Sequence, residues 1–168
     1  EDLYGVWGSA VDDVVAVGRN GTVLGYNGTS WIKMTSNTTQ HLNDVWGSSG
    51  TDIYAVGYFG TILHYDGVSW TETVDPSNAL LNGIWGSAND DVYVVGNAII
   101  LHWNGSIWAE ETPAPTANRL NAVWGDGIDF VYAVGNSGTV LQKVVGGSWQ
   151  QLAAPTAGAI LDVRGSSM

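Results

Sequence analysis

The sequence contains no cysteine and few basic residues, and it has no long apolar run. Without cysteine, a disulfide framework is excluded, and cysteine usage does not indicate the redox compartment. No apolar run reaches the roughly 18 residues of a membrane-spanning helix, so we expect no membrane insertion. Five lysines and arginines stand against 16 acidic residues, which gives a formal net charge of −11. Because nucleic-acid backbones and anionic membranes are bound by basic patches, we expect neither as a partner.

The chain is rich in glycine, small polar residues and tryptophan, of which it has nine, and only 12% of its residues are charged. This composition, with few lysines, is typical of secreted or cell-envelope proteins. We therefore expect a location outside the cytoplasm, either periplasmic or at the cell surface. A chain of 168 residues is long enough to bury a sizeable core.

One segment occurs four times along the chain at a nearly constant interval. Each copy contains a Leu-x-x-[Val/Ile]-Trp-Gly frame, whose tryptophans are evenly spaced: Trp7, Trp46, Trp85 and Trp124. A second series runs almost in step with the first: Trp31, Trp70, Trp108 and Trp149. A fifth copy begins at Ile160 and has Arg164 in place of the first tryptophan. A regular period of this length indicates a repeat architecture in which each unit packs on its neighbours.

Each repeat reads as four short β-strands separated by tight turns. In the second copy the β-forming runs cover residues 42–46, 52–56, 61–65 and 69–74, and the three turns between them are rich in glycine or contain Asp-Gly. Such a unit is one four-stranded antiparallel sheet. Repeated radially, it predicts an all-β fold, a β-propeller with the first strand innermost. The blades are expected at about 1–40, 41–79, 80–118 and 119–159, with residues 160–168 forming the start of a fifth.

The repeat also predicts how the blades close and pack. Four blades and one further first strand do not complete a ring, so we expect either a slice of a larger propeller or closure with another copy. Trp46 and Trp85 are expected to be buried between blades. The second strand of each copy ends at the same glycine, where we expect a turn with positive φ: Gly18, Gly57, Gly96 and Gly135.

The turn before each second-series tryptophan carries a recognisable motif. Residues 66–70 read Asp-Gly-Val-Ser-Trp, with variants at 27–31 and 104–108, and this run resembles the Asp-box of sialidase-like propellers. The longer repeat looks like those of bacterial propellers that include relatives of photosystem II assembly factors. The resemblance covers nearly the whole chain. It implies that the acid or amide caps the turn and that the tryptophan packs between strands, but it implies no single activity, since such propellers include lectins, hydrolases, adhesins and assembly scaffolds.

Catalytic and metal sites find little support in the sequence. A sialidase-like site needs three converging arginines, and the chain has three in total: Arg19, Arg119 and Arg164. None lies in a repeated frame, and the Arg-Ile-Pro signature of sialidases is missing. His64 and His102 occupy equivalent positions one blade apart, which is too far for both to chelate one ion, so cross-strand packing is expected. We therefore predict no enzyme, no cofactor and no metal.

Half of the acidic residues fall in turns that should lie on one rim: Asp12, Asp13, Asp52, Asp66, Asp90, Asp91, Asp126 and Asp129. Turn capping and solubility account for these residues. The alternative is a face that depends on a cation or that binds a basic partner.

The turns after the second strands differ most between copies, and irregular turns on a regular scaffold are where specific function is expected. Aromatic and arginine side chains dominate interface energies. The candidate partner-binding residues are Arg19, Tyr58, Phe59, Asn97, Arg119 and Asn136. The alternative is that Tyr58 or Phe59 folds back over its own blade.

The sequence thus predicts a non-catalytic module that binds another macromolecule, with a protein as the expected partner, or that scaffolds an extracytoplasmic assembly. A glycan-binding lectin is the second hypothesis, and a sialidase-like glycoside hydrolase is the third. A homo-oligomer is a further expectation if a second copy completes the ring.

Overall fold

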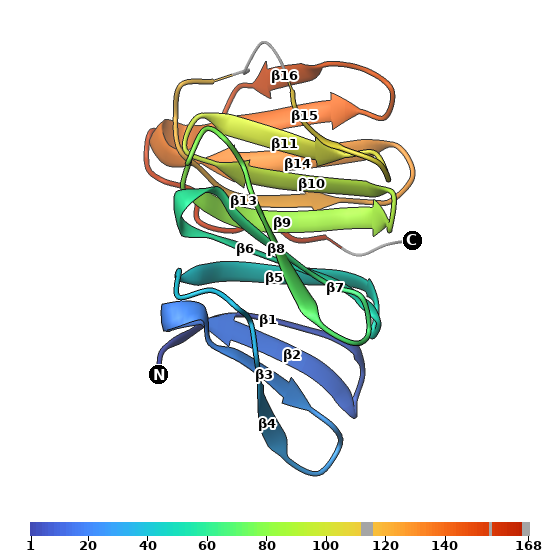
Figure 1. The fold of residues 1–168 in the computed structure, drawn as a ribbon. Helices are drawn as coiled ribbons and strands as arrows, with labels where there is room; N and C mark the ends of the chain where they lie inside the picture. The colour runs from blue at the N-terminus through green and yellow to red at the C-terminus, as the bar shows by residue number, and fades with distance from the viewer. Residues whose placement is uncertain (112–115, 155, 166–168) are drawn as a thin grey trace. The chain divides into compact units, whose positions relative to one another are not determined.

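A computed structural model describes residues 1–111, 116–154 and 156–165. They form four antiparallel four-stranded sheets, each a simple meander of consecutive strands (Figure 1). The predicted all-β architecture with four repeated sheets is therefore confirmed. The chain divides into two compact units, residues 1–81 and the residues from Asn82 onward, with two sheets in each.

The strands follow the repeat closely. The first sheet contains β1 (Leu3–Ala10), β2 (Asp13–Gly18), β3 (Val23–Tyr26) and β4 (Trp31–Met34). The second contains β5 (Leu42–Ser49), β6 (Asp52–Gly57), β7 (Thr61–Tyr65) and β8 (Trp70–Val74). The third contains β9 (Leu81–Ala88), β10 (Asp91–Gly96), β11 (Ile99–Trp103) and β12 (Trp108–Glu110). The fourth contains β13 (Leu120–Gly125), β14 (Phe130–Gly135), β15 (Val140–Val144) and β16 (Trp149–Leu152). Three short 3-10 turns interrupt the meanders: η1 (Arg19–Gly21), η2 (Tyr58–Gly60) and η3 (Asn136–Gly138).

Each unit has its own core between two sheets. In the first unit, Val17 of β2 packs in one cluster with Leu42 of β5 and Leu63 of β7. In the second unit, Val95 of β10 packs in a cluster with Leu120 of β13.

Within each unit, the tryptophan of one first strand covers the glycine of the next first strand. A Cβ added to Gly47 would lie 2.8 Å from Cη2 of Trp7, and one added to Gly125 would lie 2.4 Å from Cη2 of Trp85. Trp46 and Trp85 are both partly buried, which confirms their predicted burial only in part. Gly125, which Trp85 covers, lies on β13, an edge strand of its sheet.

The glycines that end the second strands do not have positive φ, which corrects the sequence-based expectation. Gly18 and Gly57 have φ of −174° and −168°, which is extended backbone. Glycine is needed because a carbonyl approaches closely: an added Cβ at Gly57 would lie 1.9 Å from the backbone oxygen of His41. Positive φ occurs three residues later, at Gly21 and Gly60.

Residues 160–165 are not assigned as a strand, yet their contacts are those of a first strand. The Asn121 side chain donates to the Ile160 carbonyl at 2.8 Å, and an added Cβ at Gly165 would lie 2.4 Å from Cη2 of Trp124. The equivalent asparagine contacts join Asn43 to the Leu81 carbonyl and Asn82 to the Leu120 carbonyl, both at 2.7 Å. Among the described residues, this segment has no second strand with which to form a ladder.

One face of the first sheet is open. Leu3, Val6 and Trp31 are 47%, 67% and 50% exposed. Their counterparts in the second sheet, Leu42, Val45 and Trp70, are 0%, 4% and 2% exposed. The same apolar positions of the repeat are therefore covered in one sheet and uncovered in the other.

Candidate functional site

The turns after the second strands are fixed to the segment that enters each sheet. The first residue of each turn donates its backbone N–H to a carbonyl just before the first strand: Arg19 to Asp2, Tyr58 to His41, and Asn136 to Arg119, each at 2.9 Å. In the first, second and fourth sheets, this turn therefore lies beside the segment that enters the sheet. In the third sheet the turn is reduced to Asn97 and Ala98, as the shorter sequence indicated.

The middle residue of each turn has left-handed backbone geometry. Phe59 has φ 55°, and its counterparts Asn20, Ala98 and Ser137 have φ 56°, 55° and 57°. Asparagine and small residues are tolerated in this region, whereas a bulky residue there is an outlier. The Phe59 side chain is nevertheless 59% exposed, so little packing offsets the strain.

Tyr58 and Phe59 present a pair of aromatic rings in the first unit. Tyr58 is 38% exposed, and its ring lies edge-on to His41 at 5.0 Å and to Phe59 at 6.5 Å. Nδ1 of His41 accepts the Asn20 backbone N–H at 3.0 Å, so this imidazole joins η1 to η2. Neither aromatic ring is buried over its own sheet.

A polar groove of about 410 Å³ runs beside Phe59. It is lined by Asn37, Thr38, Thr39, Gln40, Phe59, Thr61, Glu72, Val74 and Asn78. The Glu72 carboxylate accepts hydrogen bonds from the Thr38 and Thr61 hydroxyls at 3.0 and 3.1 Å. Amide, hydroxyl and carboxylate groups therefore converge next to an exposed aromatic ring.

The remaining predicted contact residues fall into separate neighbourhoods. Arg19 is exposed and lies 3.7 Å from the Asp2 carboxylate in the first unit. In the second unit Arg119 forms a backbone bridge with Asn97 and donates to Asn82 Oδ1 at 2.8 Å. The amide oxygen of Asn136 accepts from Asn121 at 3.2 Å. Three of the six residues thus belong to each unit.

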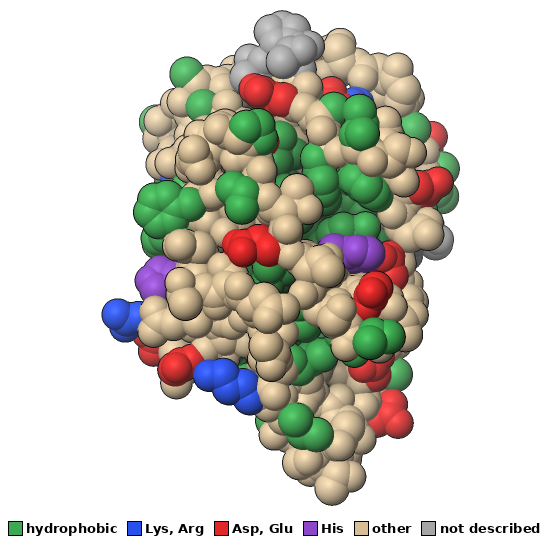
Figure 2. All heavy atoms as spheres, viewed as in Figure 1, with side chains coloured by type: hydrophobic (Ala, Val, Ile, Leu, Met, Phe, Trp, Pro, Cys, Tyr) green, Lys and Arg blue, Asp and Glu red, His purple; other side chains and the backbone are tan. Residues whose placement is uncertain are grey.

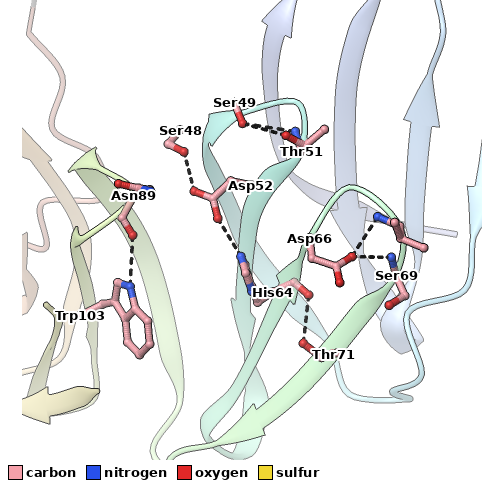
Figure 3. A network of polar contacts seen from close by, with 11 residues as sticks. Ser48, Ser49, Thr51, Asp52, His64, Asp66, Ser69, Thr71, Asn89 and Trp103 are labelled. Carbon is pink, nitrogen blue, oxygen red and sulfur yellow. Dashed lines mark hydrogen bonds and ion pairs between the residues drawn. The ribbon is translucent and has the colours of Figure 1, made fainter. Parts of the chain in front are cut away.

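A polar cluster in the second sheet was not predicted (Figure 3). The Asp52 carboxylate accepts from the Ser48 hydroxyl at 2.5 Å, and its other oxygen lies 2.7 Å from Nε2 of His64. The imidazole stacks on Tyr54 at 4.4 Å. We refer to this arrangement as the Ser–Asp–His cluster.

The third sheet repeats the cluster with Ser87, Asp91, His102 and Tyr93, at 2.5, 2.7 and 4.3 Å for the same three contacts. The sequence signal for these clusters is a serine four residues before the aspartate and a histidine on the following strand, at matching places in both copies. The expected cross-strand packing of the histidines is confirmed, but their carboxylate partners were assigned to turns.

The geometry of these clusters indicates that they stabilise the sheets. Serine and histidine bond opposite oxygens of one carboxylate, so no hydroxyl lies next to a base as nucleophilic catalysis requires. The hydrogen bond from His102 lowers the pKa of Asp91. Burial, with a smaller contribution from Asp52, raises the pKa of Tyr54 to about 12, so its phenol stays neutral at physiological pH.

In the first three sheets, the turns between third and fourth strands are capped as expected. Oδ1 of Asp66 accepts the backbone N–H groups of Val68 and Ser69 at 2.9 and 2.8 Å. The Oδ1 atoms of Asn27 and Asn104 cap the equivalent turns. Oδ1 of Asp126 accepts three backbone N–H groups in the turn between β13 and β14.

These caps predict a specific acid sensitivity. Backbone hydrogen bonds lower the pKa values of Asp66 and Asp126 in the folded protein. A lowered folded-state pKa gives stability that is present above the unfolded value of about 3.9 and is lost as pH falls through the folded value. Asp66→Asn with Asp126→Asn keeps the acceptors, so the free energy of unfolding should depend less on pH between about 4 and 2. Denaturant unfolding at several pH values measures this dependence.

The matched Asp66→Ala and Asp126→Ala variant removes both acceptors, and it should be less stable than the wild-type protein at neutral pH. An unchanged acid dependence in the asparagine variant would show that these two carboxylates do not contribute to it.

The two acidic turns of a sheet lie at the same end, as expected. An added Cβ at Gly28 would lie 2.8 Å from Cβ of Asp12, and one at Gly105 would lie 2.8 Å from Cβ of Asp90. The turn between third and fourth strands therefore packs on the turn between first and second strands. Acidic side chains are spread more widely than basic ones on the face shown in Figure 2.

Three further features of the described residues concern the metal, membrane and hydrolase alternatives. In the described part of the chain, no group of three or more His, Asp or Glu residues is placed to hold a metal ion. No described helix is long and apolar enough to span a membrane. Arg119 and Arg164 make separate local contacts, with Asn82 and Asp162 respectively.

Comparison with known proteins identifies the architecture. No protein-family model matches the sequence, and no curated protein matches it. A streptogramin B lyase structure aligns with a TM-score of 0.78 at 14% identity, covering 91% of this chain and 55% of that one. The structure of YCF48 bound to D1 peptide aligns at 0.57 and 18%, covering 91% and 67%. The RRP9 WD40 repeats align at 0.78 and 13%, covering 98% and 57%.

All three similar structures are β-propellers, and this chain spans between 55% and 67% of their lengths. At these identities the similarity shows the fold. The chain therefore has the β-propeller fold, built here from four antiparallel four-stranded sheets.

Proposed function

We propose that this chain is a non-catalytic propeller module that binds another protein through the Tyr58–Phe59 turn and scaffolds an assembly outside the cytoplasm. The observation that carries the proposal is the backbone of Phe59. A bulky residue with left-handed geometry costs about 1–3 kcal/mol, and an exposed side chain recovers little of it by packing. The three equivalent turns have asparagine, alanine or serine at this position. Strain of this kind is retained where a side chain is needed for function.

The surroundings of the turn suit a protein partner. Tyr58 and Phe59 offer rigid aromatic surface, which contributes strongly to interfaces. The groove beside Phe59 supplies hydroxyl, amide and carboxylate groups for a polar rim. The fold is compatible with peptide binding, since the YCF48 structure contains a bound D1 peptide.

A glycan-binding lectin is the second candidate, because the same groove combines an exposed aromatic ring with hydrogen-bonding groups such as Glu72 and Asn78. A glycan array separates it from the first candidate. A sialidase-like hydrolase is less supported, because the arginines make separate contacts and the Ser–Asp–His clusters pair no nucleophile with a base. A fluorogenic glycoside assay tests it directly.

Replacing Phe59 by asparagine tests the proposed contact, since asparagine occupies the equivalent position in the first sheet. We expect the variant to be more stable by about 1 kcal/mol, because the left-handed strain is relieved. We expect its affinity for the partner to fall at least about tenfold, because an interface anchor is lost. Thermal unfolding and a binding titration measure the two effects.

The partner can be captured with a photo-crosslinking phenylalanine analogue placed at position 59. The matched control carries the analogue at Val68, which is 86% exposed at the other end of the strands. A protein captured from position 59 and not from position 68 is the partner for the titration. If Phe59→Asn binds it as tightly as the wild-type protein, the turn is not the contact.

The open face of the first sheet supports a second proposal, that a further sheet covers it. We propose that these residues belong to a larger ring or close one with another copy, as the exposure of Leu3, Val6 and Trp31 suggests. Solution scattering should give a particle that is open, or larger than one chain. A closed, compact, four-bladed monomer would contradict this proposal.

A further inference from the structure

The first sheet has the aspartate of the Ser–Asp–His cluster but lacks its histidine. Asp13 begins β2 as Asp52 begins β6, and it accepts a hydrogen bond from the Ser9 hydroxyl. In the second sheet, His64 is paired in register with Tyr54. In the first sheet the corresponding pair is Gly25 and Val15. Imidazole and phenol are thus both missing beside a carboxylate that has kept its serine.

A cavity of about 280 Å³ lies at this place between the first two sheets. Its walls include Asp13, Gly25, Tyr26, Met34, Ile53 and Tyr65. Small-ligand sites begin near about 300 Å³, so this cavity accommodates one group of side-chain size. Two tyrosines and apolar side chains form the walls, and Asp13 contributes a carboxylate. Ser9 is the only side-chain hydrogen-bond partner of Asp13 among the described residues.

The second unit shows how the chain fills the corresponding place between its own two sheets. Lys143 is the repeat counterpart of Tyr65, and Glu111 is the counterpart of Met34. The Lys143 ammonium is 2.5 Å from the Glu111 carboxylate and 5.3 Å from the centroid of the Tyr93 ring. Lys143 is only 7% exposed, so a cation is held there between a carboxylate and an aromatic face. No cation from the described residues lines the cavity beside Asp13.

We propose that the cavity beside Asp13 binds a guanidinium group. A planar cation has the shape of the missing imidazole and can stack on the tyrosine faces of the wall. Its parallel N–H groups match a carboxylate, which a compact ammonium does not. The net charge of −11 favours the approach of such a ligand. The site is independent of the Tyr58–Phe59 turn, since Asp13 begins β2 and Gly50 precedes β6, whereas η2 follows the end of β6.

The experiment is a titration of the isotope-labelled protein followed by backbone amide NMR signals. The probes are N-acetyl-arginine methylamide, its lysine analogue and its uncharged citrulline analogue. The arginine probe should shift the Gly25 and Gly50 signals, the lysine probe should bind at least about tenfold more weakly, and citrulline should cause no shift. A Gly-Arg-Gly peptide that binds more tightly than the arginine probe identifies a peptide as the source of the group. Equal affinity identifies a free guanidinium compound.

Two variants and a matched control complete the test. Gly25→His with Met34→Thr recreates the second-sheet residues and should abolish the shifts without lowering the melting temperature. Met34 has to change because its Sδ would lie 3.1 Å from an added Cβ at Gly25. Asp13→Asn should weaken binding at least about tenfold. Asp52→Asn, at the carboxylate already bonded to His64, should keep the shifts.

The proposal would be overturned if the Gly25→His/Met34→Thr variant (the refilled variant) and Asp13→Asn both bound the arginine probe with wild-type affinity. Equal binding of the arginine and citrulline probes would also overturn it. An arginine probe that causes no shift in the wild-type protein would overturn it as well. If the refilled variant does not fold, Asp13→Asn decides the outcome against the Asp52→Asn control.

Discussion

Trp70→Ala is expected to destabilise the first unit by about 3–5 kcal/mol, the usual range for removing a large buried aromatic side chain. The Trp70 side chain is 2% exposed, belongs to the core cluster of the first two sheets, and packs against Tyr65 at 5.2 Å. Its indole N–H has no hydrogen-bond partner in the described part of the chain. The loss is therefore one of packing. Urea unfolding monitored by circular dichroism measures it.

The matched control is Trp31→Ala, because Trp31 has the same position in the repeat and is 50% exposed. This variant should lower the free energy of unfolding by less than half as much as Trp70→Ala. Equal losses would mean that the two tryptophans are buried to the same degree in solution, with a sheet covering the open face of the first sheet.

Gly57→Ala is expected to destabilise the protein by about 3 kcal/mol or more, at the upper end of overpacking effects. The added methyl group would meet the His41 carbonyl oxygen at 1.9 Å, and displacing that carbonyl would break its hydrogen bond from the Tyr58 backbone N–H. Gly57→Asn should be at least as damaging. If positive φ were the reason for this glycine, asparagine would instead be partly tolerated. Thermal unfolding of both variants distinguishes the two explanations.

Gly158→Ala is the control for this pair. Its nearest neighbour would be the Thr156 hydroxyl at 3.4 Å, which is an ordinary contact, and its φ is not in the left-handed region. A change within about 0.5 kcal/mol is expected. A large effect at Gly158 or a small one at Gly57 would remove the close-approach explanation.

The repeat made most of the fold predictable. Glycine-rich turns and β-forming runs recur at a fixed period, so one correctly assigned copy assigns the other three. The cap at Asp66 was predictable for the same reason, since it depends on residues two and three positions away. Local sequence contains the information for turns and strands of this kind.

Contacts set by strand register were not predictable from spacing alone. The Ser–Asp–His cluster joins Asp52 to a histidine on another strand, and only the observed pairing brings the two side chains together. The function of Gly57 was misread because the approaching carbonyl belongs to His41, which precedes β5, whereas Gly57 ends β6. The cavity beside Gly25 depends on the registers of two sheets at once.

The geometry of Phe59 was predictable from the sequence only in part. When the repeats are aligned, Phe59 occupies the same position as Asn20 and Ser137, just before a glycine. This context favours left-handed backbone geometry. Sequence alone identified Phe59 as a large aromatic residue at a turn. The backbone geometry adds that its position is strained, and this strain is the basis of the proposed contact.

Hydrogen exchange of the protein bound to the partner captured at position 59 is the most direct test of the proposed contact surface. We predict protection of residues 58–60 and of the groove segment 37–40, with little change in the acidic turns at 50–52 and 66–69. Protection confined to those acidic turns, with residues 58–60 exchanging as in the free protein, would contradict it.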